Sequence, residues 1–141
     1  MCEGLRRRSA ETESANRYQR FLLARFIFQS GHYRKIAPPK PKPNAFLPDP
    51  SKLKTSAIWR DKLSEQEIWK TGDLLGTKRG EKPPARADFG IATVSEAKLT
   101  IEPDPLPQIP QHLNLCGWPI DKDEQKAIAL LLCARSTLIV R

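Results

Sequence analysis

Residues 63–76, LSEQEIWKTGDLLG, contain the local signal that contributes most to the fold prediction. Ser64 and Glu67 have the spacing of a capping box, in which each side chain bonds the backbone N–H of the other residue. The apolar residues on either side of this pair have the spacing of a hydrophobic staple. The pattern therefore predicts a helix over residues 65–75, followed by a polar loop over residues 76–88.

Further elements are expected on both sides of this helix. The short apolar runs at residues 56–60, 89–94 and 97–101 are interpreted as strands. Near the end of the chain, Asp121 has the position of an N-cap for a last helix with a broad apolar face. The β-branched residues within 137–140 then predict a terminal strand.

The first structured segment has two interpretations. Apolar residues recur with helical spacing over residues 14–29, which predicts a basic amphipathic helix. Its last residues, FIFQSG, also fit a short strand, because periodicity does not separate the two in so short a run. The aromatic side chains suit a protein core first, with a partner's groove or an anionic membrane surface as alternatives.

Helices and strands in this order neither alternate strictly nor fall into separate blocks, which predicts an α+β fold. We expect a small two-layer single domain with about three helices, a short and mostly antiparallel sheet, and long proline-rich loops. The chain of 141 residues has the length of one domain. Residues 1–13 are interpreted as a flexible basic N-terminal tail and residues 14–141 as the domain.

A basic, proline-rich loop occupies residues 32–55 of that domain. Six prolines between residues 38 and 50 exclude a helix or a central strand there. The segment is either a linker or an ordered loop laid over the core. Residues 45–47, Ala-Phe-Leu, favour the ordered loop, because this apolar triplet needs a surface on which to pack.

The net charge of +8 is concentrated in the first half of the chain. Residues 1–70 contain 15 Lys and Arg against 7 Asp and Glu, whereas residues 71–141 contain 9 of each. Clustered cations with interleaved aromatic residues are typical of nucleic-acid binding, because they neutralise phosphates and stack on bases. A solvated basic surface and a surface for an acidic protein are the alternatives. The candidate nucleic-acid-binding residues are Tyr33, Arg34, Lys35, Lys40, Lys42, Lys52, Lys54, Arg60 and Lys62.

The two histidines suggest a possible catalytic role. His32 and His112 are candidates for the base and the acid of a metal-independent ribonuclease, with Arg60 stabilising the charge on the phosphate. The alternative is that each histidine is a capping or packing residue, since nothing in the sequence brings the two rings together. Whether the protein is an enzyme is therefore left open at this point.

Several other classes of function lack their usual signatures. Three cysteines without close spacing argue against a disulfide framework, and no metal site is expected, because the pair His112 and Cys116 has no second pair. Glycine-rich phosphate-binding motifs are absent from the sequence, so no cofactor is expected. Neither a signal peptide nor a membrane span is apparent, which predicts a cytoplasmic location.

The sequence therefore predicts a small basic protein that binds RNA or single-stranded nucleic acid; if the protein is an enzyme, the predicted activity is that of a metal-independent, toxin-type endoribonuclease. The alternative is a non-catalytic subunit that docks on a larger protein or nucleoprotein partner. In that case the contacts would come from the proline-rich loop and the aromatic N-terminal helix.

Overall fold

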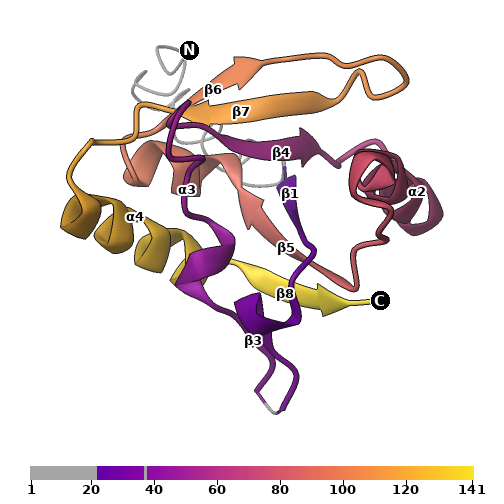
Figure 1. Ribbon diagram of the computed structural model, residues 1–141, viewed down its shortest axis with the longest axis horizontal. Coiled ribbons are helices and arrows are strands. Elements are labelled where there is room, and N and C mark those ends of the chain that lie inside the picture. Colours follow the sequence, from indigo (N-terminus) through magenta and orange to yellow (C-terminus); the bar gives the residue numbers. More distant parts are fainter. Residues whose placement is uncertain (1–21, 37) are drawn as a thin grey trace, which may run out of the picture.

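The computed structural model describes residues 22–36 and 38–141 and has the predicted α+β architecture. Its main sheet has the strand order β6-β7-β4-β1-β5-β8, and all neighbouring strands are antiparallel (Figure 1). The strands are β1 (Leu22–Ile27), β4 (Thr55–Trp59), β5 (Ala85–Gly90), β6 (Thr100–Pro103), β7 (His112–Cys116) and β8 (Thr137–Val140). The helices are α2 (Glu65–Leu75), α3 (Ile91–Glu96) and α4 (Lys122–Arg135), and a small second sheet pairs β2 (Tyr33–Arg34) with β3 (Lys40–Pro41).

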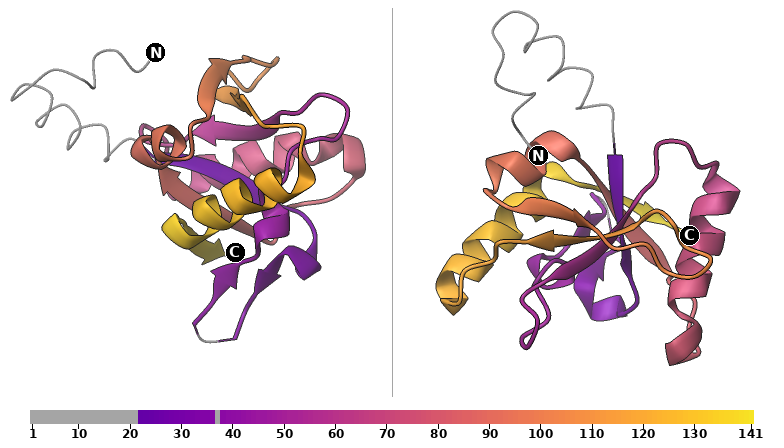
Figure 2. Two further views of the ribbon diagram at one scale, coloured as in Figure 1. Left: turned by 90° about the vertical axis from the view of Figure 1, so that its left-hand side faces the viewer. Right: turned by 90° about the horizontal axis from the view of Figure 1, so that it is seen from above.

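Helices cover both faces of the main sheet, with α4 on one side and α2 on the other (Figure 2). Alternate residues of a strand point to opposite faces, so β1 contributes to two apolar clusters. Leu23 and Ile27 belong to the larger cluster, which includes residues of α3 and α4. Ala24 and Phe26 belong to a smaller cluster with Ile68 of α2.

The helices α2 and α4 begin where their capping signals predict. The Ser64 hydroxyl accepts a hydrogen bond from the Glu67 N–H at 3.1 Å, and the Glu67 carboxylate accepts one from the Ser64 N–H at 2.8 Å. The Asp121 carboxylate accepts a hydrogen bond from the Glu124 N–H at 2.9 Å at the start of α4. The predicted terminal strand is confirmed as β8.

Several sequence-based boundaries were wrong. The part of residues 14–29 that the structure describes contains the strand β1, which pairs along its whole length with β5. The strand expected at residues 89–94 is the end of β5 followed by the helix α3, and β5 begins inside the expected polar loop. For β1 and β5, pairing with a distant strand, which a local pattern does not reveal, decides the outcome.

The described part of the proline-rich loop packs over the sheet, as its apolar triplet predicted. Ala45 and Phe46 are fully buried, and the Phe46 ring meets Phe89 of β5 edge to face at 5.7 Å between ring centroids. The Thr55 hydroxyl donates a hydrogen bond to the Phe46 carbonyl at 2.9 Å. The predicted N-terminal tail, residues 1–13, lies outside the described residues.

Within the described ranges, no helix combines the length and the apolar composition needed to cross a membrane.

Candidate cationic site

The strands β1 and β4 separate partway along the sheet, and the side chain of Arg25 lies at this point. Their pairing is limited to Leu23 with Trp59 and Ala24 with Ile58, after which β1 continues only beside β5. The Arg25 guanidinium spans the gap: Nε–H donates to the Ala45 carbonyl and Nη1–H to the Ser56 carbonyl, each at 2.9 Å. Both acceptors are neutral, so the positive charge of Arg25 is not offset.

A second arginine lies beside the first. Arg79 ends the 3₁₀ turn Thr77–Arg79 that follows α2, and its guanidinium carbon is 4.4 Å from the centre of the Phe28 ring. Burial, and next the repulsion from Arg79, lower the pKa of Arg25 to about 10. The pKa of His32 is also lowered, first by burial and then by the charges of Arg25 and Lys42.

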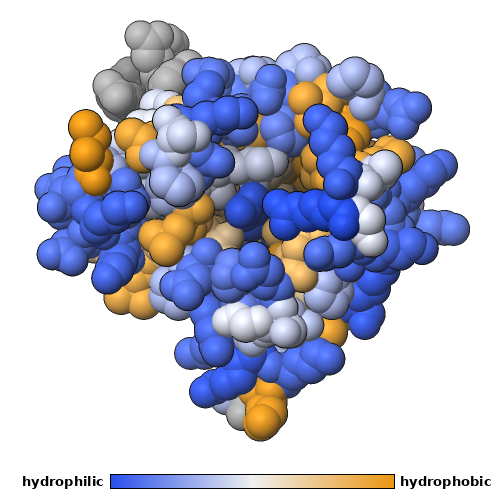
Figure 3. Space-filling view, viewed as in Figure 1, coloured by the Kyte–Doolittle hydropathy of each residue, from blue (hydrophilic) through white to orange (hydrophobic). Residues whose placement is uncertain are grey.

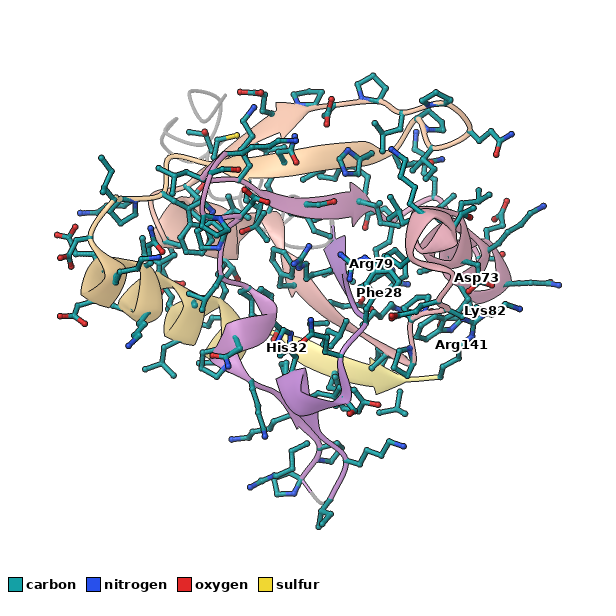
Figure 4. The ribbon with its side chains drawn as sticks, in the orientation of Figure 1. Phe28, His32, Asp73, Arg79, Lys82 and Arg141 are labelled. Carbon is teal, nitrogen blue, oxygen red and sulfur yellow. The ribbon has the colours of Figure 1, made fainter. Side chains whose placement is uncertain are left out.

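Two small hollows share these residues. Each has a volume of about 110 Å³ and is lined by Arg25, Phe26, Phe28 and Arg79. One of them is also lined by Ser56, Ala57 and Leu75, and the other by Ile27, Gln29, His32 and Ala45. Figure 3 shows hydrophilic side chains around a depression near the centre of this face, and Figure 4 places Phe28 and Arg79 together there, with His32 nearby. We call this pair of hollows the cationic hollow.

The cationic hollow lacks negative side chains. Arg25, His32, Lys42 and Arg79 form no ion pair with any carboxylate of residues 22–36 and 38–141. The Arg25 side chain is partly exposed, and its Nη2 N–H groups have no acceptor among the described residues, so they remain as donors for an anion.

The candidate nucleic-acid-binding residues are spread over several surfaces. Tyr33 is buried in the larger apolar cluster, so its ring is not free to stack on a base. Lys54 is paired with Glu102 at 3.2 Å, and Arg60 with Asp88 at 2.8 Å, which offsets part of their charge. The remaining candidates are exposed: Arg34, Lys35, Lys40, Lys42, Lys52 and Lys62.

Arg60 belongs to a separate, largely buried ion-pair cluster. Arg86 is 1% exposed and Asp88 is 6% exposed, and the Arg86 Nε–H donates to the Asp88 carboxylate at 2.9 Å. Glu65 of α2 accepts a hydrogen bond from Arg86 at 2.8 Å and lies 3.5 Å from Arg60. This cluster connects α2 to the sheet, which gives Arg60 a structural role in addition to the phosphate contact predicted for it.

His112 lies on the sheet with hydrogen-bonding partners of its own. Its Nδ1 is 2.9 Å from the Asp104 carbonyl oxygen, which only accepts, so Nδ1 bears the proton of the neutral ring. Nε2 is then an acceptor, and the Ser56 hydroxyl donates to it at 2.6 Å. The Asp104 carboxylate lies 3.3 Å from Nδ1 and also accepts a hydrogen bond from Asn114 at 3.0 Å.

The two histidines do not share partners. In the main sheet His112 is paired with Ile58 of β4, and Ile58 is paired with Ala24 of β1. The backbones of His112 and Ala24 are therefore two strand spacings apart, which is about 10 Å. His32 follows Ala24 by eight residues, beyond the end of β1. Of the three candidate catalytic residues, His32 lines one part of the cationic hollow, His112 bonds Ser56, which lines the other part, and Arg60 belongs to the ion-pair cluster.

Sequence reasoning missed both arginines of the cationic hollow. Arg25 was assigned to a helix, and Arg79 lay in a loop outside the basic segment. The available signal was an arginine within an apolar run, FLLARFIF, since such an arginine requires polar partners once the run is buried.

Comparisons with protein-family models, with curated proteins and with solved structures find no match to this chain. Within the part of the chain that the structure describes, no group of three or more His, Cys, Asp or Glu residues is placed to hold a metal ion.

Proposed function

We propose that this protein binds RNA or single-stranded nucleic acid and that the cationic hollow is its main phosphate contact. The observation that supports this proposal is that Arg25 and Arg79 line one accessible hollow with no carboxylate partner. Guanidinium groups present N–H donors in a planar fork that matches the oxygens of a phosphate. We also propose a cytoplasmic location, based on the sparse cysteines.

Exposed cations close to the hollow extend the proposed contact surface. Lys42 contributes to the positive potential at His32, and Lys40 lies on the short strand β3 that precedes it. Phe28 lines the hollow, and its ring supports the Arg79 guanidinium there. A strand of nucleic acid would then follow the proline-rich loop away from the hollow.

The test is the binding of a labelled single-stranded RNA measured by fluorescence anisotropy at increasing salt concentration. Phosphate contacts release counterions, so affinity is expected to fall steeply with salt. Arg79→Gln is expected to weaken binding about tenfold and to reduce the salt slope by about one. Lys126→Ala is the matched control, because it removes one exposed, unpaired positive charge from α4 and is expected to bind like the original chain.

A flat salt response would contradict the nucleic-acid proposal. It would favour the alternative of a non-catalytic subunit that docks on a larger partner through its proline-rich loop. Duplex RNA and single-stranded DNA, measured under the same conditions, distinguish the kinds of nucleic acid.

The contact between Ser56 and His112 favours hydrolysis as a second candidate function. A serine hydroxyl that donates to a neutral imidazole resembles an activated serine nucleophile; here the Nδ1–H of that imidazole bonds the Asp104 backbone carbonyl, and the Asp104 carboxylate lies 3.3 Å away. In the proposed step Ser56 Oγ attacks the carbonyl carbon of an ester and its proton passes to Nε2 of His112. The imidazolium returns that proton to the departing alcohol, and water then releases the acid from Ser56.

A fluorophosphonate probe tests this second function, because it reacts covalently with activated serines. Labelling at Ser56, located by peptide mass spectrometry and lost in Ser56→Ala and His112→Gln, is the expected result. An unlabelled, folded protein would contradict it. The ribonuclease predicted from His32 and His112 remains a prediction, and incubation of RNA with the protein and a chelator tests it in the same preparation.

A further inference from the structure

We propose that the cationic hollow recognises a terminal phosphomonoester, the phosphate group at the end of a nucleotide or of an RNA strand. This inference rests on the proposed function and specifies which phosphate the site binds. It is carried by the size of the hollow, by its uncompensated charge and by the way in which the two guanidinium groups are held.

The size of the hollow suits a single phosphate group. Each of its two parts has a volume of about 110 Å³, enough for only a few water molecules. Its walls include the apolar side chains of Phe26, Phe28 and Leu75. A phosphate within a strand has a sugar on either side and needs an open groove, whereas a terminal phosphate enters a hollow with its free oxygens first.

The charge of the hollow suits a dianion better than a monoanion. A phosphate monoester has a charge of about −1.5 to −2 at neutral pH, whereas a diester in the backbone has one negative charge. Arg25 and Arg79 together offer two positive charges that no carboxylate of the described residues offsets. His32 lies in the other part of the hollow and adds a third charge when it is protonated.

Arg25 is held before any ligand arrives, and Arg79 is supported on one side. Two backbone carbonyls fix Arg25 through Nε and Nη1, which leaves the Nη2 N–H groups without an acceptor among the described residues. The Phe28 ring supports Arg79 from one side at 4.4 Å, and N–H groups in the plane of a stacked guanidinium remain available for hydrogen bonds. A site with fixed donors loses less entropy on binding than one built from free lysines.

The experiment compares three versions of one short single-stranded RNA, with a 5′-phosphate, a 3′-phosphate or hydroxyl groups at both ends. Anisotropy is expected to show binding about tenfold tighter for at least one phosphorylated version, because two charge-assisted contacts are added. The version that gains affinity identifies the end that is recognised. The gain is expected to disappear in Arg79→Gln and to persist in the control Lys126→Ala.

Titration calorimetry with a nucleoside monophosphate separates this inference from the proposed function. Equal affinity for the three RNAs would overturn the terminal-phosphate inference while RNA binding itself persists. If none of the three RNAs binds, nucleic-acid binding is contradicted, and the monophosphate then decides the inference. If the monophosphate binds with a measurable heat and Arg79→Gln abolishes that heat, the inference is supported. If the monophosphate does not bind, the inference is overturned.

Circular dichroism confirms that the variants are folded. Arg79→Lys, which keeps the charge but loses the planar fork of N–H donors, is expected to recover part of the gain in affinity.

Discussion

The Arg25 side chain donates a hydrogen bond from Nη1 to the Ser56 carbonyl at 2.9 Å, across the gap where β1 and β4 separate. At this position a hydrogen bond from a side chain takes the place of the backbone hydrogen bond that would join two paired strands. The same side chain places a positive charge inside the sheet. The same guanidinium bonds the Ala45 carbonyl of the proline-rich loop. Arg25 therefore connects β1, β4 and this loop, and it lines the cationic hollow as well.

The first prediction concerns this connection. Arg25→Met keeps the unbranched stem of the side chain but leaves the carbonyls of Ala45 and Ser56 without their donor. Losing these bonds is expected to lower the free energy of unfolding by about 2 kcal/mol, measured by urea denaturation. Arg79→Met is the matched control, because the Arg79 side chain is exposed and bonds no backbone carbonyl of the described residues, so the unfolding free energy should change by less than about 0.5 kcal/mol. Equal losses in the two variants would contradict the structural role of Arg25.

The second prediction concerns pH. The pKa of His32 is lowered by burial and by Arg25 and Lys42, so the free protein holds this proton less tightly than the unfolded chain does. Stability is therefore expected to fall as the pH decreases through the range below about 6.5. Protonation also adds a cation to the hollow, so affinity for a hydroxyl-ended RNA is expected to rise over the same range, in which its diester phosphates keep their charge.

His32→Asn tests both effects, because the amide does not titrate. Affinity in this variant should be nearly independent of pH between about 5 and 7. If the original chain and the variant respond to acid in the same way, another group is responsible and the prediction fails.

The third prediction concerns the contact between α2 and β1. A Cβ at Gly72 would lie 2.6 Å from the Phe26 ring and 2.8 Å from Pro83, closer than packed atoms approach. Gly72→Ala is therefore expected to destabilise the fold by about 1–3 kcal/mol, although alanine favours helices. Gly31→Ala is the matched control, since nothing lies within 4 Å of its added Cβ. Thermal denaturation of the two variants measures the difference, and an increase in the melting temperature of Gly72→Ala would contradict the packing described.

The fourth prediction concerns the buried ion pairs. Asp88→Asn removes the negative charge that lies between Arg60 and Arg86 and leaves two cations close together. The expected loss of unfolding free energy is about 3 kcal/mol, because Asp88 is buried and only the exposed Glu65 carboxylate remains to offset the two cations. The control Asp123→Asn removes an exposed carboxylate from the first turn of α4 and should cost less than about 1 kcal/mol. A similar loss in both variants would mean that Asp88 has no special role.

Local sequence signals determined the helices α2 and α4. Ser64 with Glu67, and Asp121 with Glu124, supply capping partners within three residues, so the information needed to start each helix lies in the helix itself. The apolar triplet that contains Phe46 likewise predicted correctly that the proline-rich loop packs against the protein. The α+β class followed from the order of these segments.

The central strands and the cationic hollow were decided only by the tertiary structure. The segment that forms β1 has helical spacing, yet it becomes a strand because β5, some sixty residues away, pairs with it from Leu22 to Ile27. The hollow likewise combines Arg25, His32 and Arg79 from three separate segments. A capping signal acts within one turn of a helix, whereas strand pairing and charge clustering depend on residues that become neighbours only when the chain has folded.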